Sequence, residues 1–106
     1  MVESGSKTAD VSIERDGDLC RVRPGETEVG VGDEIRFQNL TDKAVTILFS
    51  EEKLFQQGKI KITSGKNMEM AVQQMELGRY PYAVYCECIN DFALASSMPI
   101  IIIVRK

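Results

Sequence analysis

Apolar and polar residues alternate along most of the chain, in short runs separated by turn residues at intervals of roughly 8–12 residues. Val11 and Ile13 alternate with polar neighbours in one run, and Ile35 and Phe37 do so in another. Successive side chains of a β-strand point to opposite faces, so this pattern predicts strands that each bury one face. Asp-Gly and Pro-Gly pairs between the runs mark the turns.

Residues 50–58, SEEKLFQQG, form the segment that predicts a helix rather than a strand. Ser50 can cap the first turn and Gly58 can end it, and the two Glu residues after Ser50 favour the positive end of a helix. The sequence therefore predicts an all-β protein, a two-sheet antiparallel Greek-key β-sandwich of seven to eight strands with one short helix. An immunoglobulin-like sandwich is the competing architecture, but the chain has no Trp for its core.

The length of 106 residues indicates one domain. Residues 1–8 form a polar lead that we expect to be disordered, and residues 9–106 form the domain. The longest apolar run, Pro99–Val104, is too short to insert across a membrane. The first residues contain no apolar signal-peptide core, so we expect a cytoplasmic protein from the chain as written. A periplasmic or exported location follows instead if the chain begins inside a longer protein.

Charge and composition exclude several classes of function. The net charge is -3 and the basic residues are scattered, which argues against nucleic acid as a partner. The chain has no histidine, so it lacks the usual general base and the commonest transition-metal ligand. No constellation of Asp, Glu or Lys replaces them. We therefore expect neither catalysis nor a bound cofactor.

Four segments, taken in order, resemble the cupredoxin family of plastocyanin, azurin and their relatives. VGVGDEIRFQNLT resembles the third-strand signature of that family, with Gly32-Asp33 at the turn and Asn39 near the end. KAVTILF resembles the following strand, GRYPYAVYC the approach to the copper-binding cysteine, and MPIIIIV the terminal strand. The resemblance covers most of the chain from about Val11.

The resemblance implies a β-sandwich whose relatives transfer electrons at a copper ion held by two imidazoles, one thiolate and a weak axial Met. Cys86 or Cys88 matches the thiolate, and Met98 matches the axial ligand. Ala44 stands at the position of the first His, and residues 89–91 contain no His at the second. The comparison with the family therefore predicts that the type 1 copper site has been lost.

Cys86 and Cys88 are two residues apart in a predicted strand, which directs both thiols to one face at a spacing of about 6.6 Å. One interpretation is that both are small buried hydrophobic residues. A second is a soft-metal site for Cu(I), formed by Cys86, Cys88 and Met98. A third is redox sensing by an exposed thiol.

Pro99 is followed by four consecutive isoleucines, so apolar and polar residues do not alternate in this segment. If Ile100 and Ile102 face the core, Ile101 and Ile103 face outward and form an apolar patch, which often marks an interface. The N-terminal segment or a loop could instead cover them. The sequence thus predicts a noncatalytic binding or structural module, acting as a homo-oligomer or with a protein partner in a larger assembly. The alternative function is Cu(I) binding or handling.

Overall fold

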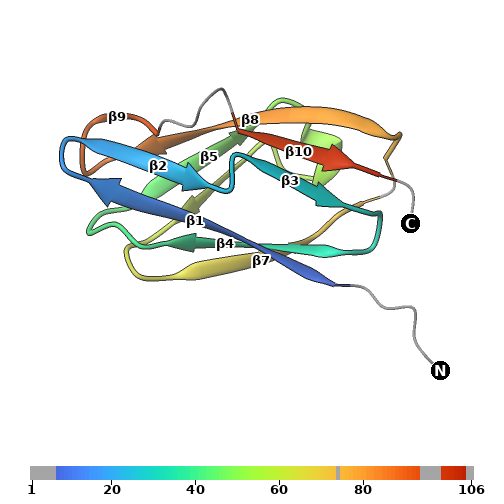
Figure 1. The fold of residues 1–106 in the computed structure, drawn as a ribbon, viewed down its shortest axis with the longest axis horizontal. Helices are drawn as coiled ribbons and strands as arrows, with labels where there is room; N and C mark the ends of the chain where they lie inside the picture. Colours follow the sequence, from blue (N-terminus) through green and yellow to red (C-terminus); the bar gives the residue numbers. More distant parts are fainter. Residues whose placement is uncertain (1–6, 74, 94–98, 105–106) are drawn as a thin grey trace.

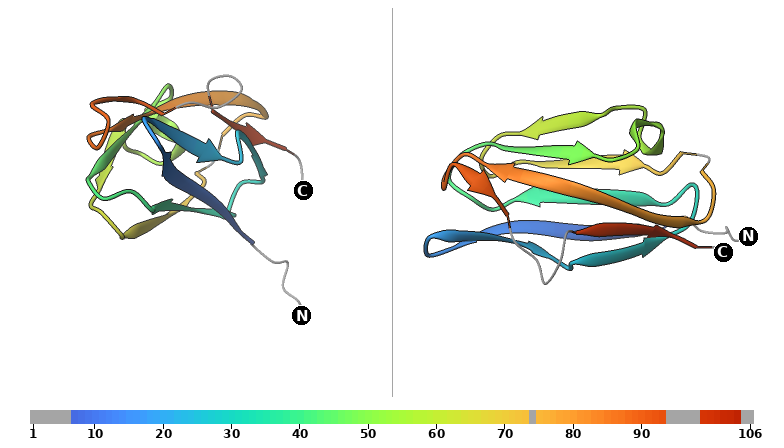
Figure 2. Two further views of the ribbon diagram at one scale, coloured as in Figure 1. Left: turned by 60° about the vertical axis from the view of Figure 1, so that its left-hand side comes forward. Right: turned by 90° about the horizontal axis from the view of Figure 1, so that it is seen from above.

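The alternating runs form two β-sheets that face each other, with the strands roughly along the long axis of the molecule (Figures 1 and 2). The computed structural model describes residues 7–73, 75–93 and 99–104. The four-stranded sheet has the order β2-β1-β4-β7 and contains β1 (Thr8–Asp16), β2 (Leu19–Arg23), β4 (Glu34–Asn39) and β7 (Asn67–Ala71). The six-stranded sheet has the order β3-β10-β8-β5-β6 and contains β3 (Glu26–Val29), β10 (Ile100–Ile103), β8 (Gly78–Cys86), β5 (Val45–Phe49) and β6 (Lys59–Ile62), with β9 (Asp91–Phe92) paired to β8.

The all-β sandwich is confirmed, but its sheets are mixed rather than antiparallel. β1 pairs with β4 in parallel, and β10 pairs with β3 in parallel, whereas the other strand pairs are antiparallel. The described residues form ten strands instead of seven or eight. The additional strands are short ones such as β3 and β9, which are too brief for alternation to reveal.

β10 corrects the prediction for the isoleucine run. Ile101 and Ile103 are 0% and 2% exposed, whereas Ile100 and Ile102 are half-buried, so the expectation that Ile101 and Ile103 face outward is wrong. Residues directly opposite each other in a sheet share a face. Ile101 lies opposite the buried Thr27 of β3, and this pairing directs it into the core.

The segment that follows β5 forms one 3₁₀ turn, η1 (Glu52–Leu54), rather than a longer helix capped by Ser50. Glu51 caps it by accepting a hydrogen bond from the backbone nitrogen of Lys53 at 3.3 Å. The inward side chain of Leu54 anchors the turn to the core. No helix in the described part of the chain is long and apolar enough to cross a membrane.

The domain begins earlier than residue 9. The backbone nitrogen of Lys7 donates to a carboxylate oxygen of Asp33 at 3.1 Å, and the Lys7 carbonyl accepts from the nitrogen of Glu34 at 2.9 Å. Thr8 opens β1. Residues 7 and 8 therefore belong to the sandwich and not to a disordered lead.

Four aromatic rings form the centre of the core between the two sheets. Phe37 lies 5.7 Å from Tyr82 and 6.1 Å from Phe49, measured between ring centroids, and Phe55 lies 4.9 Å from Phe49. Tilted and edge-on rings at such spacings pack favourably. The Tyr82 side chain is 1% exposed, and its hydroxyl has no hydrogen-bond partner among the described residues. Burial raises the pKa of Tyr82, so the hydroxyl stays protonated.

Replacing Tyr82 by Phe tests the cost of this buried hydroxyl. An unpaired buried hydroxyl is destabilising, so we expect Tyr82→Phe to leave the free energy of unfolding unchanged or to raise it by up to about 1 kcal/mol in urea titrations. The matched control is Tyr80→Phe, because the Tyr80 hydroxyl donates to the Glu76 carbonyl at 2.7 Å. That variant should lose about 1 kcal/mol. A larger loss in Tyr82→Phe than in Tyr80→Phe would contradict the interpretation.

Candidate functional site at the cysteine end of the sandwich

Asn39, the last residue of β4, organises one end of the sandwich. Its side chain is fully buried, and its amide nitrogen donates to the carbonyls of Lys43 at 2.8 Å and Ile62 at 2.9 Å. Its amide oxygen accepts from the backbone nitrogen and the hydroxyl of Thr41, at 2.9 and 2.7 Å. Because Ile62 ends β6, this one side chain connects the two sheets and shapes the loop between β4 and β5.

The loop that Asn39 holds brings the expected position of the first His next to the cysteine strand. Val45 pairs with Cys86, and the backbone nitrogen of Glu87 donates to the Ala44 carbonyl at 3.2 Å. The backbone arrangement implied by the resemblance is therefore present, but a methyl group stands where an imidazole is needed. With no histidine in the chain, the donor set does not fit a type 1 copper ion.

The turn after β8 holds Asn90 among the residues where the second His was expected. Asn90 has a φ of 54°, in the left-handed region that Asn tolerates better than most residues. Its side-chain oxygen accepts a hydrogen bond from the hydroxyl of Tyr85, whose ring packs edge-on against Phe92 at 5.3 Å. Asn90 thus stabilises the turn.

Cys86 and Cys88 do not share a strand face as predicted. Cys86 is the last residue of β8 and is fully buried, whereas Cys88 lies in the following turn and is partly exposed. The chain leaves the extended conformation after Cys86, so the spacing of a strand no longer applies to the two thiols. Met98, the third residue of the predicted Cu(I) site, lies outside the described residues.

Cys20, which the sequence interpretation did not include in the site, is the residue that contacts Cys88. It is the second residue of β2, is fully buried, and has its Sγ atom 3.3 Å from that of Cys88. The two cysteines are 68 positions apart, Cys20 in the four-stranded sheet and Cys88 in the turn that follows β8 of the other sheet. In the sequence, Cys20 and Val22 are two residues apart in a predicted strand, which indicates that both side chains face the core. This pattern does not show which residue of the other sheet or its loops Cys20 contacts.

Burial makes these thiols poor nucleophiles near neutral pH. It raises the pKa of Cys20, and the neighbouring thiols of Cys88 and Cys86 raise it further. Burial also raises the pKa of Cys86. The thiolate is the form that attacks and binds metals, so either reaction at Cys20 or Cys86 must first remove a tightly held proton. Within the described ranges, no group of three or more His, Cys, Asp or Glu side chains is arranged to hold a metal ion.

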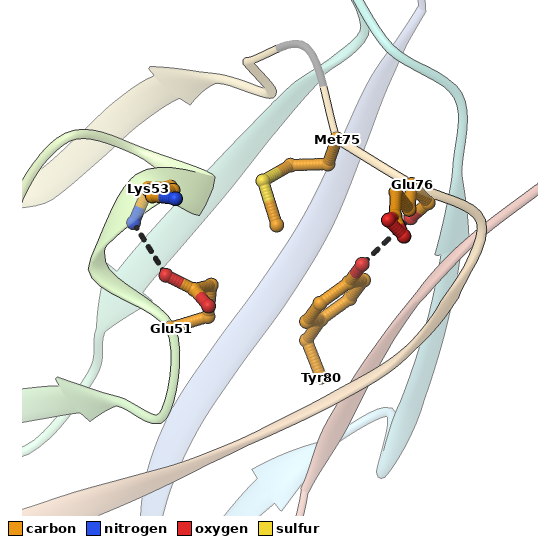
Figure 3. Close-up of a pocket in the computed structure, with 5 residues that line it drawn as sticks. All are labelled: Glu51, Lys53, Met75, Glu76 and Tyr80. Carbon is orange, nitrogen blue, oxygen red and sulfur yellow. Dashed lines mark hydrogen bonds between the residues drawn. The ribbon is translucent and has the colours of Figure 1, made fainter.

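A pocket of about 340 Å³ lies at the opposite end of the sandwich, between η1 and the start of β8. It is lined by Glu51, Lys53, Met75, Glu76 and Tyr80. Figure 3 shows its polar groups directed at local backbone atoms: the Tyr80 hydroxyl at the Glu76 carbonyl and the Glu51 carboxylate at the Lys53 nitrogen. These two hydrogen bonds hold the local turns beside the pocket.

Solved structures from several organisms share this architecture. A novel purple cupredoxin from Nitrosopumilus maritimus matches with a TM-score of 0.62 and 14% sequence identity, over 91% of this chain and 99% of that chain. Dithionite-reduced auracyanin from Roseiflexus castenholzii matches with a TM-score of 0.59 and 12% identity, over 96% and 100%. The blue copper oxidase from Nitrosomonas europaea matches with a TM-score of 0.56 and 15% identity, over 93% of this chain but 39% of its own.

The chain therefore has the cupredoxin fold, as the four sequence segments predicted. No sequence profile of a known protein family matches it, and no curated protein does. At these sequence identities the structural similarity defines the fold, and the activity has to be inferred from the residues of this chain.

The raised thiol pKa values predict a loss of stability at alkaline pH. Above about pH 8.5 the unfolded chain releases its thiol protons, whereas the folded chain retains those of Cys20 and Cys86. The free energy of unfolding then falls with rising pH, by at most about 1.4 kcal/mol per pH unit for each retained proton. In urea titrations at about pH 7 and about pH 10, we expect Cys20→Ala to lose less stability with pH than the wild type. Equal losses would contradict the assignment.

Proposed function

We propose that this protein is a noncatalytic cupredoxin-like binding module without a type 1 copper centre. The observation that carries the proposal is the environment of Cys86. The strand that delivers the copper thiolate in the implied family here ends in a fully buried thiol with a raised pKa, beside Ala44. Cys86 is part of the core, and this burial supports a role in binding rather than in metal chemistry.

The outer face of the six-stranded sheet is the surface that supports binding. Ile100 lies directly opposite Pro81, and Leu48 lies directly opposite Ala83, so apolar side chains continue across β10, β8 and β5. Ile102 extends this group along β10, between Glu28 of β3 and Arg79 of β8. The Arg79 guanidinium also pairs with Glu26 at 3.0 Å. We call these five apolar residues the apolar face. Alternation with buried neighbours directs all of them away from the core, and Leu48 is 36% exposed.

The edges of the same face carry opposite charges. Glu26 and Glu28 are exposed on the edge strand β3, and Lys59 and Lys61 are exposed on the opposite edge strand β6. A two-fold axis along β8, between two such faces, places β3 of one copy over β6 of the other. The acidic edge then meets the basic edge on both sides of a shared apolar centre. This order of charges favours a second copy of the chain as the partner.

Sedimentation of the wild type and of Ile102→Lys tests the proposed self-association. We expect a concentration-dependent dimer for the wild type and a monomer for Ile102→Lys, because a charge at the centre of the interface would lose its water. Leu40→Lys is the matched control, since Leu40 is 57% exposed and lies outside the apolar face. It should dimerise like the wild type. A monomeric wild type at high concentration would rule out self-association through this face.

Charge reversal at the two edges tests the proposed orientation. Glu26→Lys and Lys59→Glu should each weaken the dimer. The strand registers place Glu26 level with Pro81 of β8 and Lys59 level with Ala83, so each variant brings like charges close together in the two-fold arrangement. The double variant restores opposite charges and should recover most of the lost affinity in sedimentation equilibrium. If the double variant loses the summed affinity of the two single variants, this orientation of the dimer is excluded. The apolar contact itself is tested separately by Ile102→Lys.

Soft-metal binding is the second candidate function, favoured by the 3.3 Å contact between the Sγ atoms of Cys20 and Cys88. Two thiolates that converge from different segments can hold Cu(I), which prefers sulfur ligands. The site would pair Cys20 with the predicted ligand Cys88, close to Cys86, whereas the predicted ligand Met98 lies outside the described residues. Titration with Cu(I) under reducing conditions, then gel filtration and metal analysis, tests this function. Retained copper that is lost in Cys88→Ser supports it, and copper-free wild type or unchanged binding by Cys88→Ser rejects it.

A further inference from the structure

We propose that Cys20 and Cys88 form a reversible disulfide that covalently links the two sheets. The two Sγ atoms are already 3.3 Å apart. A disulfide bond is about 2.0 Å long, so the sulfurs need to approach by roughly 1.3 Å. The bond would join the β1–β2 hairpin of the four-stranded sheet to the turn after β8 of the six-stranded sheet.

The backbone around the two cysteines leaves room for this approach. β2 is an edge strand, bound on one side only, where Cys20 pairs with Arg15 of β1. Cys88 lies in a turn closed by backbone hydrogen bonds from Ile89 to Cys86 and from Asn90 to Glu87, at 3.3 and 3.2 Å. Neither cysteine is held in a central strand. Small shifts in a hairpin end and a surface turn therefore suffice to bring the sulfurs together.

Cys86 is the less suitable partner for either thiol. It is fully buried and pairs with Val45 within a sheet that continues on both sides of β8. Cys86 and Cys88 have only one residue between them, so a bond between their thiols would close a very small ring within the turn that Asn90 stabilises. Cys86 consequently stays a free thiol.

The reaction is thiol–disulfide exchange with an external disulfide, either a small molecule or a thiol oxidoreductase. Cys88, the partly exposed thiol, loses its proton to water and attacks one sulfur of the oxidant. This forms a mixed disulfide and releases one thiolate. Cys20 then attacks Sγ of Cys88, its proton passes to the second leaving thiolate, and the external disulfide is reduced to two thiols while the Cys20–Cys88 bond forms.

The bond would restrict the unfolded chain more than the folded one. It closes a segment of 68 positions, and the entropy lost by the unfolded state grows with the length of the closed loop. We expect oxidation to raise the thermal midpoint by roughly 10 °C or more, because the folded geometry needs little adjustment. This effect does not depend on self-association or on bound metal.

Oxidation with oxidised glutathione, followed by counting of free thiols in denaturant, tests the proposal. The chain has three cysteines, so formation of the bond leaves one free thiol. Peptide mapping by mass spectrometry should identify the link between Cys20 and Cys88. Cys86→Ala is the matched variant that should still form the bond and show the rise in thermal midpoint.

Cys88→Ser replaces a partly exposed residue and should fold, but it should show no rise in thermal midpoint on oxidation. Three free thiols after oxidation would overturn the proposal. A mapped bond between Cys86 and Cys88, a bond between Cys20 and Cys86, or a link between two chains would also overturn it. Reduction should restore all three thiols and the original midpoint.

Discussion

The structure depends on one buried amide, the side chain of Asn39. It makes hydrogen bonds through both its nitrogen and its oxygen, to the carbonyls of Lys43 and Ile62 and to both donors of Thr41. Leaving any of these groups unpaired inside the protein would cost about 1–3 kcal/mol, so the loop and both sheets are held in one arrangement. The convergence of Ala44, Cys86 and Cys88 at this end follows from that constraint.

At the end of the sandwich that Asn39 organises, Ala44 lies beside the cysteine strand, and the buried Cys20 and Cys86 belong to the core. Cys88, in the turn after β8, contacts Cys20 of β2. A buried thiol with a raised pKa is inert until a partly exposed neighbour such as Cys88 reacts first.

Sequence alternation was sufficient to predict an all-β sandwich, though not its strand count or its parallel pairs, because each strand buries one face. The buried residues Val11, Ile13, Ile35 and Phe37 mark that face. The same reasoning fails for the isoleucine run, residues 100–103. With apolar residues at every position, only the pairing of β10 with β3 and β8 decides which side is buried. The pairing places Ile100 and Ile102 on the outer face, the opposite of what the sequence predicts.

The sequence by itself determined the all-β class, the cupredoxin resemblance and the lack of imidazole ligands, because these depend on local periodicity, segment order and composition. Only the tertiary structure decided which thiols meet. Cys86 and Cys88 are close in the chain, yet the turn after β8 separates their roles, while Cys20 reaches Cys88 across the sandwich. Contacts between residues 68 positions apart are set by how the two sheets pack. The local sequence pattern around either residue does not predict that packing.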